Sequence, residues 1–228
     1  MRSRTGYPAG TPCDRRVLAG IYRRQFEEIR QMRRNVYSLL PLRSTGTVFE
    51  PGCGTGLLAT ELRDLTGARY TGMDIDPDVL PDGEGFIQGD AIAGPVKADM
   101  YVSSFFFSIV PDPVEWLARV GRVLTPGGFY AVMGEYDYDA LEATPDDGFS
   151  VRLLQGLRES GLYTGHGGRL DAYFSASGFT KLHGGEVLSS PSVPDRDFLA
   201  MNLAELPEKL PYIKWRIVWG IWRNRGER

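Results

Sequence analysis

The segment 47–61, Thr-Val-Phe-Glu-Pro-Gly-Cys-Gly-Thr-Gly-Leu-Leu-Ala-Thr-Glu, restricts the fold more than any other part of this chain. A short apolar run, the glycines Gly52, Gly54 and Gly56, and a run of helix-forming residues predict a buried strand, a tight turn and a helix. Glycine allows the torsions of such a turn and lets a ligand approach the main chain closely. The free N–H groups of the first helical turn would point at that ligand. The segment therefore predicts a nucleotide-cofactor loop.

The glycine spacing alone does not identify the cofactor. Gly54, Gly56 and Ala59 satisfy the G-x-G-x-x-G/A pattern of dinucleotide-binding loops. Glu50, however, precedes the first glycine by two residues, so its carboxylate is expected near the cofactor. A carboxylate repels a pyrophosphate and attracts an ammonium or sulfonium group. Glu50 therefore favours a positively charged cofactor.

Segment 47–61 and several later segments resemble the class I S-adenosylmethionine-dependent methyltransferases. The first segment resembles motif I of that family, and residues 69–78, 85–91, 98–105 and 122–131 resemble the regions of its second to fifth strands in order. Gly178-Phe179 resembles the Gly-Phe pair before its sixth strand. The resemblance implies an α/β fold, with a Rossmann-like seven-stranded, mostly parallel sheet, helices on both faces and an antiparallel last strand. It also implies S-adenosyl-L-methionine as the cofactor.

The resemblance assigns roles to acidic residues at the strand ends. Asp74 corresponds to the acid that binds the two ribose hydroxyls, and Asp90 to the acid that accepts from the adenine amino group. Asp74 follows the glycines by about 20 residues, the separation that a strand-helix-strand unit needs. Cys53 is expected to fill the loop as a small residue, not to act as a nucleophile. The candidate cofactor-binding residues are Glu50, Gly52, Cys53, Gly54, Gly56, Asp74, Ile75, Asp90, Ala91, Ser104 and Tyr22.

From residue 46 onward, short β-rich runs alternate with helical ones. The predicted strands are 46–50, 69–74, 85–88, 99–104, 128–134 and 179–188, and the predicted helices are 56–66, 113–123 and 149–159. Such alternation predicts a mostly parallel sheet whose ligands bind outside the carboxyl ends of the strands.

The C-terminal run 212–222 supports two interpretations. Its tryptophans and basic residues are typical of helices that lie at lipid interfaces. Its apolar residues alternate with mixed ones, however, which favours a strand. In the resembled fold a final strand inserts antiparallel beside the fifth, and this run would supply it.

The N-terminal part, residues 1–45, is predicted to be a helical lid. A helix from Asp14 to about Leu40 has one apolar face, and the opposite face, which includes Arg33, is expected in solvent. The resemblance implies that this helix covers the cofactor, with Tyr22 or Arg30 as its contact. Residues 46–228 would form the methyltransferase domain, with a proline-rich insertion at 190–211 over the acceptor side.

Composition limits the partners. A chain of 228 residues with 42% hydrophobic residues and a net charge of −3 can bury a core but offers no overall basic field for nucleic acid. The sequence has two cysteines and no apolar leader, so we do not expect a secreted, disulfide-bonded protein and predict a cytoplasmic location. No apolar run reaches the roughly 18 residues of a membrane span, and no metal-ligand spacing is present. The oligomeric state stays open.

Methyl transfer is an in-line displacement, so alignment and exclusion of water matter more than acid-base groups. The acceptor pocket is expected to be framed by residues following the fourth and fifth strands: Ser104, Phe105, Phe106, Phe107, Ser108, Glu135, Tyr136, Asp137 and Tyr138. Tyr136 and Asp137 are the candidate catalytic residues, although an ordinary polar turn is the alternative. Ser108 stands where many relatives have a His, which argues against a histidine base.

Three functions remain open at this point. The leading hypothesis is methyl transfer to a small-molecule acceptor. One alternative is a nicotinamide-dependent oxidoreductase that uses the dinucleotide frame, although it leaves Glu50 and Asp90 unexplained. The other is a cofactor-binding scaffold or regulatory protein without catalysis, which the lack of an obvious base would fit.

Overall fold

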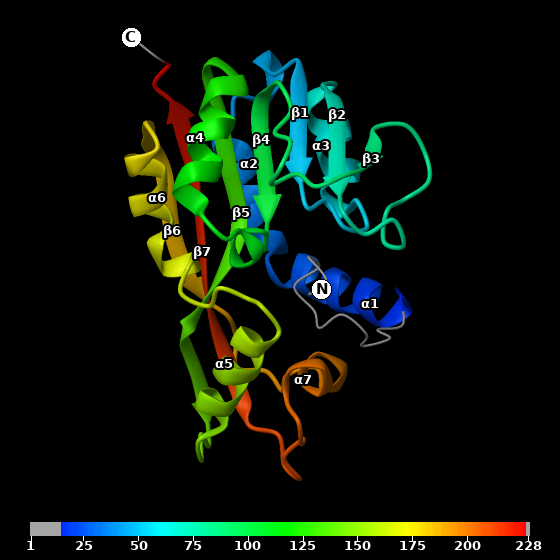
Figure 1. Ribbon diagram of the computed structural model, residues 1–228, viewed down its shortest axis with the longest axis vertical. Coiled ribbons are helices and arrows are strands. Elements are labelled where there is room, and N and C mark those ends of the chain that lie inside the picture. Colours follow the sequence, from blue (N-terminus) through cyan, green and yellow to red (C-terminus); the bar gives the residue numbers. More distant parts are fainter. Residues whose placement is uncertain (1–14, 227–228) are drawn as a thin grey trace.

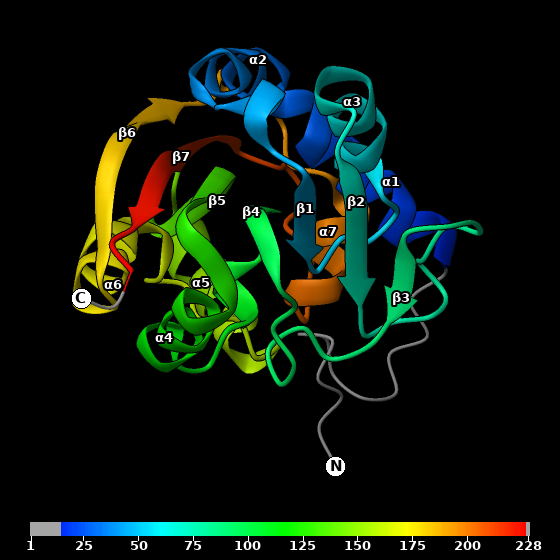
Figure 2. The ribbon, with the colours of Figure 1, turned by 90° about the horizontal axis from the view of Figure 1, so that it is seen from above.

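A computed structural model describes residues 15–226 of the chain. Its centre is a seven-stranded sheet in the order β3-β2-β1-β4-β5-β7-β6 (Figures 1 and 2). The strands are β1 Thr47–Pro51, β2 Arg69–Asp74, β3 Phe86–Gln88, β4 Ala98–Ser104, β5 Leu124–Thr144, β6 Phe179–Leu188 and β7 Tyr212–Asn224. The pairs from β3 to β5 are parallel, and β7 runs antiparallel to both β5 and β6. The predicted fold class is confirmed.

Helices cover both faces of this sheet (Figure 2). They are α1 Arg15–Glu28, α2 Arg30–Leu39, α3 Leu57–Thr66, α4 Pro113–Val123, α5 Phe149–Glu159, α6 Leu170–Ala176 and α7 Arg196–Asn202. Helices α2 and α3 pack on one face, while α4 and α6 pack on the other around Trp116 and the stacked rings of Phe174 and Trp222, whose centroids lie 3.9 Å apart. The parallel strands therefore present their carboxyl ends at one open edge.

The predicted N-terminal helix is divided in two at Ile29, and its expected cap Asp14 lies outside the described residues. Arg33 explains the division, because its Nη1 donates to the carbonyl of Phe26 near the end of α1. The expectation that Arg33 faces solvent is wrong: its side chain is fully buried, and Nη2 lies 2.9 Å from Oε1 of Glu61 on α3. This ion pair joins the N-terminal helices to the helix that follows the glycine loop.

Strand β5 is much longer than the predicted 128–134. It pairs with β4 only as far as Gly134, and beyond Asp137, where the pairing of β7 with β6 also ends, β5 and β7 continue as a ribbon (Figure 1). Helices α5 and α7 lie on this ribbon, and α7 belongs to the segment 190–211 that was predicted as an insertion. Residues 135–138 are therefore inside the fifth strand and do not follow it as predicted, and the alternative of an ordinary polar turn at this place is wrong.

The C-terminal run is strand β7, so the interfacial-helix alternative is wrong. Ile213, Ile217 and Ile221 are buried in the sheet, as the alternation predicted. Within residues 15–226, no helix combines the length and the apolar character that crossing a membrane requires.

Candidate functional site

The glycine loop between β1 and α3 lies at the carboxyl edge of the sheet. Gly52, Gly54 and Gly56 have φ values of 64°, 49° and 67°, a left-handed region that glycine adopts without steric cost. Neighbouring rings approach the loop closely as well. A Cβ at Gly52 would lie 2.6 Å from Cδ2 of Phe106, and one at Gly54 would lie 3.3 Å from Cδ2 of Tyr22. The loop is therefore a tight backbone turn covered by aromatic side chains.

Asp74 lies at the end of β2, beside this loop. Its Oδ2 accepts the N–H of Gly54 at 2.9 Å, and its Oδ1 accepts the N–H of Asp76 at 3.0 Å. Burial raises the pKa of Asp74, while these N–H groups act in the opposite direction. Each carboxylate oxygen keeps a second acceptor position that could bind a diol hydroxyl. Asp74 can therefore brace the loop and hold a ribose, with the half-buried Ile75 next to it.

Asp90 lies close to Asp74, because the N–H of Gly89 donates to the carbonyl of Asp74 at 2.9 Å. Oδ1 of Asp90 accepts the N–H of Ile92 at 3.0 Å, which fixes the turn after β3. Ala91 is buried behind this turn. The structure thus brings the two predicted acids to the same edge.

Glu50 is buried, and its carboxylate accepts the hydroxyl of Tyr70 on the neighbouring strand β2. Burial raises the pKa of Glu50 to about 8, although the Tyr70 hydroxyl partly opposes this rise. Cys53 is buried in the loop, and burial raises the pKa of its thiol, so the neutral form predominates. This state fits the expected packing role of Cys53.

Tyr22 of α1 lies over the loop at Gly54, as the contact distance given above indicates. Helix α1 runs past the carboxyl edge of the sheet (Figure 1). Arg30, the other candidate contact, is on the exposed side of the helix pair, where it forms an ion pair with Glu27. Of the two candidates, the structure places Tyr22 at the loop.

Aromatic residues follow on the β4–β5 side. Phe105 has a φ of 52°, uncommon for a residue with a side chain, and its ring centroid lies 4.5 Å from that of Tyr136. The Tyr136 ring also packs 4.9 Å from Trp215 of β7. The hydroxyl of Tyr136 donates to Oε2 of Glu28, at the end of α1, over 2.7 Å. Helix α1 therefore contacts both the glycine loop and this aromatic wall.

Tyr136 and Asp137, predicted together as catalytic, point to opposite faces of β5. Oδ2 of Asp137 lies 3.9 Å from Nη1 of Arg216, and a Cβ at Gly168 would lie 2.9 Å from the same oxygen. The aspartate thus faces a backbone turn and an arginine. The two side chains do not form one cluster.

Ser104 ends β4 between the cofactor and aromatic sides. Its Oγ is buried and has no hydrogen-bond partner among residues 15–226. Buried hydroxyls normally have a partner, so this oxygen is free to bond to a ligand. With the glycine turn and Asp74, it supplies the donors and acceptors that an adenosyl cofactor with a ribose and an amino acid end needs.

Three residues at the site were not predicted: Tyr70, Glu28 and Trp215. Tyr70 and Glu28 meet partners that are 20 and 108 positions away in sequence. Local patterns carry no information on such contacts. Of these three residues, only Trp215 could have been found from the sequence, through the alternation of apolar residues in the segment that forms β7.

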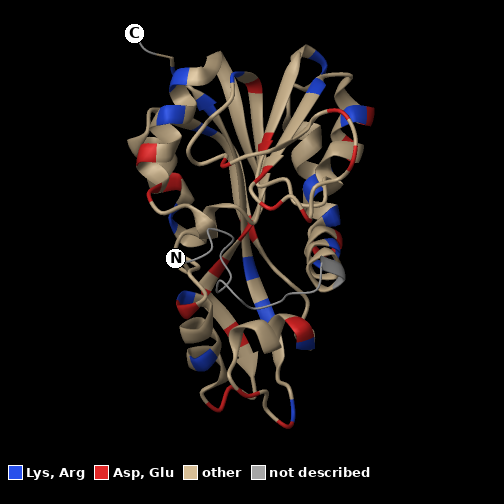
Figure 3. Cartoon of the chain, turned by 45° about the vertical axis from the view of Figure 1, so that its right-hand side comes forward, with Lys and Arg blue, Asp and Glu red and all other residues tan. Residues whose placement is uncertain are grey.

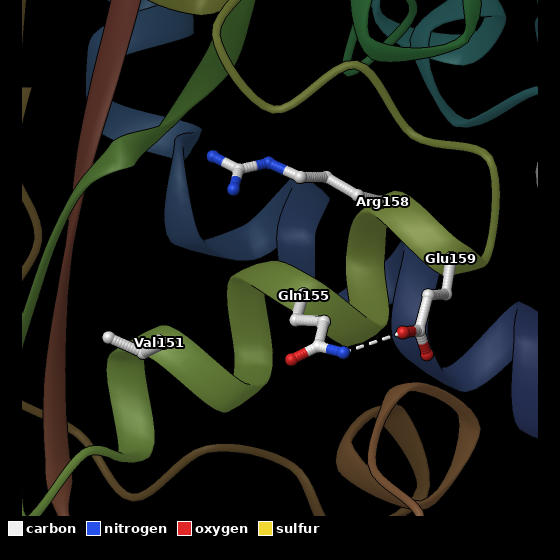
Figure 4. Close-up of a pocket in the computed structure, with 4 residues that line it drawn as sticks. All are labelled: Val151, Gln155, Arg158 and Glu159. Atoms are coloured by element: carbon white, nitrogen blue, oxygen red, sulfur yellow. Dashed lines mark hydrogen bonds between the residues drawn. The ribbon is translucent and has the colours of Figure 1, made fainter.

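A separate hollow of about 570 Å³ lies on α5 (Figure 4). It is lined by Val151, Gln155, Arg158 and Glu159, and Gln155 donates to Glu159 over 2.8 Å. None of the predicted site residues lines it. The hollow is therefore distinct from the edge that carries the glycine loop.

Comparison with known proteins agrees with this geometry. Residues 49–132 match the family model of a methyltransferase domain. The YcgJ protein from Bacillus subtilis is 12% identical with a TM-score of 0.62, and the match covers 87% of this chain and 100% of that one. The S-adenosylmethionine-dependent methyltransferase from Mesorhizobium loti is 19% identical with a TM-score of 0.56, over 83% and 96% of the two chains.

A third structure is the plantazolicin methyltransferase BpumL, solved with S-adenosylhomocysteine and a triazolic desmethyl analogue. It is 15% identical with a TM-score of 0.55, and the match covers 94% of this chain and 92% of that one. The matched segment 49–132 contains the glycine loop, Asp74, Asp90 and Ser104, and the sheet has the seven strands and the antiparallel last strand beside the fifth that the resemblance implied. The chain therefore contains a methyltransferase domain at residues 49–132, and its fold as a whole is that of the S-adenosylmethionine-dependent methyltransferases.

Proposed function

We propose that this enzyme transfers the methyl group of S-adenosylmethionine to a small-molecule acceptor. The observation that carries the proposal is the span of α1. Tyr22 of this helix covers Gly54 in the cofactor loop, and Glu28 binds Tyr136 on the aromatic side. A helix that covers both halves of the reaction site fits an enclosed acceptor better than a polymer that must lie along an open edge.

The insertion 190–211 adds to this cover. Nη2 of Arg24 on α1 lies 2.7 Å from Oδ2 of Asp195, which caps the start of α7. The pair is partly exposed, so it contributes little stability and can open. We propose that residues 15–45, the described part of the predicted N-terminal segment 1–45, form a lid, and that this lid and the insertion together close the acceptor side. Acidic and basic residues are interspersed along the helices and strands drawn in Figure 3, which also favours a small acceptor over nucleic acid.

The bound cofactor supplies a methyl group on a positively charged sulfur. In our proposal, Asp74 holds the ribose and Asp90 the adenine, while the glycine loop and Ser104 fix the rest of the molecule. Phe105 and Tyr136 exclude water and orient the acceptor, since alignment is the main requirement of a displacement.

Tyr136 acts in this scheme as a neutral phenol. Burial raises its pKa well above the usual value, and the neighbouring Glu28 carboxylate acts in the same direction. The hydroxyl keeps its proton and steers the acceptor as a hydrogen-bonding group. Asp137, on the opposite face of β5, takes no part in this step.

A turnover experiment tests the proposal. Labelled S-adenosylmethionine is incubated with the enzyme and with fractions of a metabolite extract separated by size. We expect label in fractions of low molecular mass, and the Tyr136→Phe variant, which loses the hydroxyl but keeps the ring, should lose roughly tenfold or more in rate.

Label that appears only in protein or nucleic acid would contradict the small-molecule assignment. No label in any fraction, despite tight cofactor binding, would favour a scaffold or regulatory role. The matched control is Tyr212→Phe, because Tyr212 is exposed at the start of β7 and should leave the rate unchanged.

A further inference from the structure

The loop that follows β4 contacts both the cofactor half and the acceptor half of the site. The ring of Phe106 in this loop lies against Gly52, the first glycine of the cofactor turn. A Cβ at Gly52 would lie only 2.6 Å from Cδ2 of this ring. The ring of Phe105, its neighbour, lies against Tyr136. The position of this loop therefore sets the cofactor side and the acceptor side at once.

A buried carboxyl group of β5 accepts a hydrogen bond from the backbone of this loop. Glu135 of β5 is 0% exposed, and its Oε2 accepts the N–H of Phe107 at 2.8 Å. The N–H groups of Phe106 and Ser108 lie close enough to favour the ionised carboxylate, although only the Phe107 bond has full hydrogen-bond geometry. Phe105 is held separately, by donation of its N–H to the carbonyl of Gly134 at 2.8 Å.

Glu135 faces the loop because β5 contains an irregularity. The register shifts between Val132 and Glu135 on the β7 side, and between Ser103 and Ser104 on the β4 side. An extra residue in a strand reverses which face the following side chains occupy and often lies next to an active site. The shift turns Glu135 toward the loop and, one residue later, Tyr136 toward the aromatic wall.

Burying a carboxyl group in order to hold a loop costs free energy. Burial raises the pKa of Glu135 to about 8. Its Oε1 has no hydrogen-bond partner within the part of the chain that the structure describes. Because apolar residues of similar volume often replace buried charged groups without loss of stability, stability alone does not account for an acid here.

We propose that Glu135 is a positioning residue for methyl transfer, whose carboxyl group holds the loop 105–108 so that Phe106 supports the cofactor turn and Phe105 lies against Tyr136. The acceptor half of this statement rests on the proposed function. The cofactor half does not, and the experiment below addresses that half with S-adenosylhomocysteine as the probe. A failed search for a small acceptor would therefore leave its result standing.

The experiment compares two substitutions of Glu135 with one control substitution elsewhere in β5. Glu135→Gln keeps an oxygen that can accept from Phe107, Glu135→Leu fills a similar volume without one, and Glu142→Gln is the control in the same strand, where Glu142 forms an exposed ion pair with Lys214. For each variant we measure thermal stability, the affinity for S-adenosylhomocysteine by calorimetry, and amide hydrogen exchange.

The leucine variant separates positioning from structure. We expect it to remain folded, with the amide of Phe107 exchanging about tenfold faster or more, since the hydrogen bond from this N–H to the side chain of Glu135 is lost. Its affinity should fall about fivefold to tenfold, because the loop spends less time in the competent position. The glutamine variant should recover most of both quantities, and the Glu142→Gln control should match the wild type.

If the leucine variant binds S-adenosylhomocysteine as tightly as the wild type does, with equal protection of the Phe107 amide, Glu135 does not position the loop. The same conclusion follows if glutamine and leucine give equal losses.

Discussion

The Asp74→Ala variant should bind S-adenosylhomocysteine about 100-fold more weakly than the wild type, or worse, because two charge-assisted hydrogen bonds to the ribose are each worth about 1.5–3 kcal/mol. The substitution also removes the acceptor for the N–H of Gly54, so the loop loses a support at the same time. Calorimetry gives the affinity, and circular dichroism shows whether the fold is kept.

Two further variants make this result interpretable. Asp74→Asn keeps one oxygen that can accept from Gly54, so it should preserve the loop and lose part of the affinity. Asp82→Ala removes an exposed acid from the segment between β2 and β3 and should bind as the wild type does. Unchanged affinity in Asp74→Ala would show that the ribose lies elsewhere.

The second large effect concerns pH and stability. Burial raises the pKa of Glu50 to about 8, and that of Glu135 to about 8 as well, from the usual 4.5 of a glutamate side chain. Between about pH 4.5 and pH 8 the folded state keeps protons that the unfolded state has released, so the free energy of unfolding falls as pH rises. The stabilisation is complete below the unfolded pKa and is lost as pH passes the folded one.

Other carboxyl groups make the free energy of unfolding decrease at acidic pH. The pKa of Asp99 is lowered by hydrogen bonds from Thr47, among others, against the effect of burial, and the pKa of Glu61 is lowered by Arg33 in the same way. Their stabilisation is present above the unfolded pKa and lost as pH falls. Together the two groups of carboxylates place the maximum stability near pH 5, as a rough estimate.

Scanning calorimetry from pH 5 to pH 9 tests this prediction. The melting temperature of the wild type should fall by several degrees or more over this range, and Glu50→Gln combined with Glu135→Gln should flatten the slope, since neither amide titrates. A wild-type melting temperature that rises with pH, or an equally steep fall in the double variant, would contradict the raised pKa values.

The elements of the cofactor half were predictable because local sequence determines them. The turn at Gly52, Gly54 and Gly56 depends on backbone torsions that few other residues adopt, and β1, which leads into it, is a short run that is almost wholly buried. The final strand was predictable for the same reason. Its alternation persists over residues 212–222.

The acceptor half was not predictable in detail. The two register shifts in β5 break the period of two, so the strand seemed to end at 134, although it continues to Thr144. The irregularity before Glu135 decides that Glu135 faces the loop, and the ordinary alternation of a strand then places Tyr136 and Asp137 on opposite faces. A single extra residue leaves no distinctive pattern in a sequence.

Long-range pairs were missed for a related reason. Arg33 lies on a helix face that carries many charges, and only the position of Glu61, 28 residues later, makes its burial favourable. The contact between Glu28 and Tyr136 joins segments that are 108 positions apart. Such pairs become visible only once the strands and helices are placed in space.

A crystal structure with S-adenosylhomocysteine tests the central claim most directly, namely that acids at successive strand ends hold one adenosyl cofactor on the glycine turn. We predict the ribose hydroxyls within hydrogen-bonding distance of Asp74, the adenine beside Asp90, and the ring of Tyr22 over the ligand. A ligand bound away from the glycine turn, or a ribose that makes no contact with Asp74, would contradict the account.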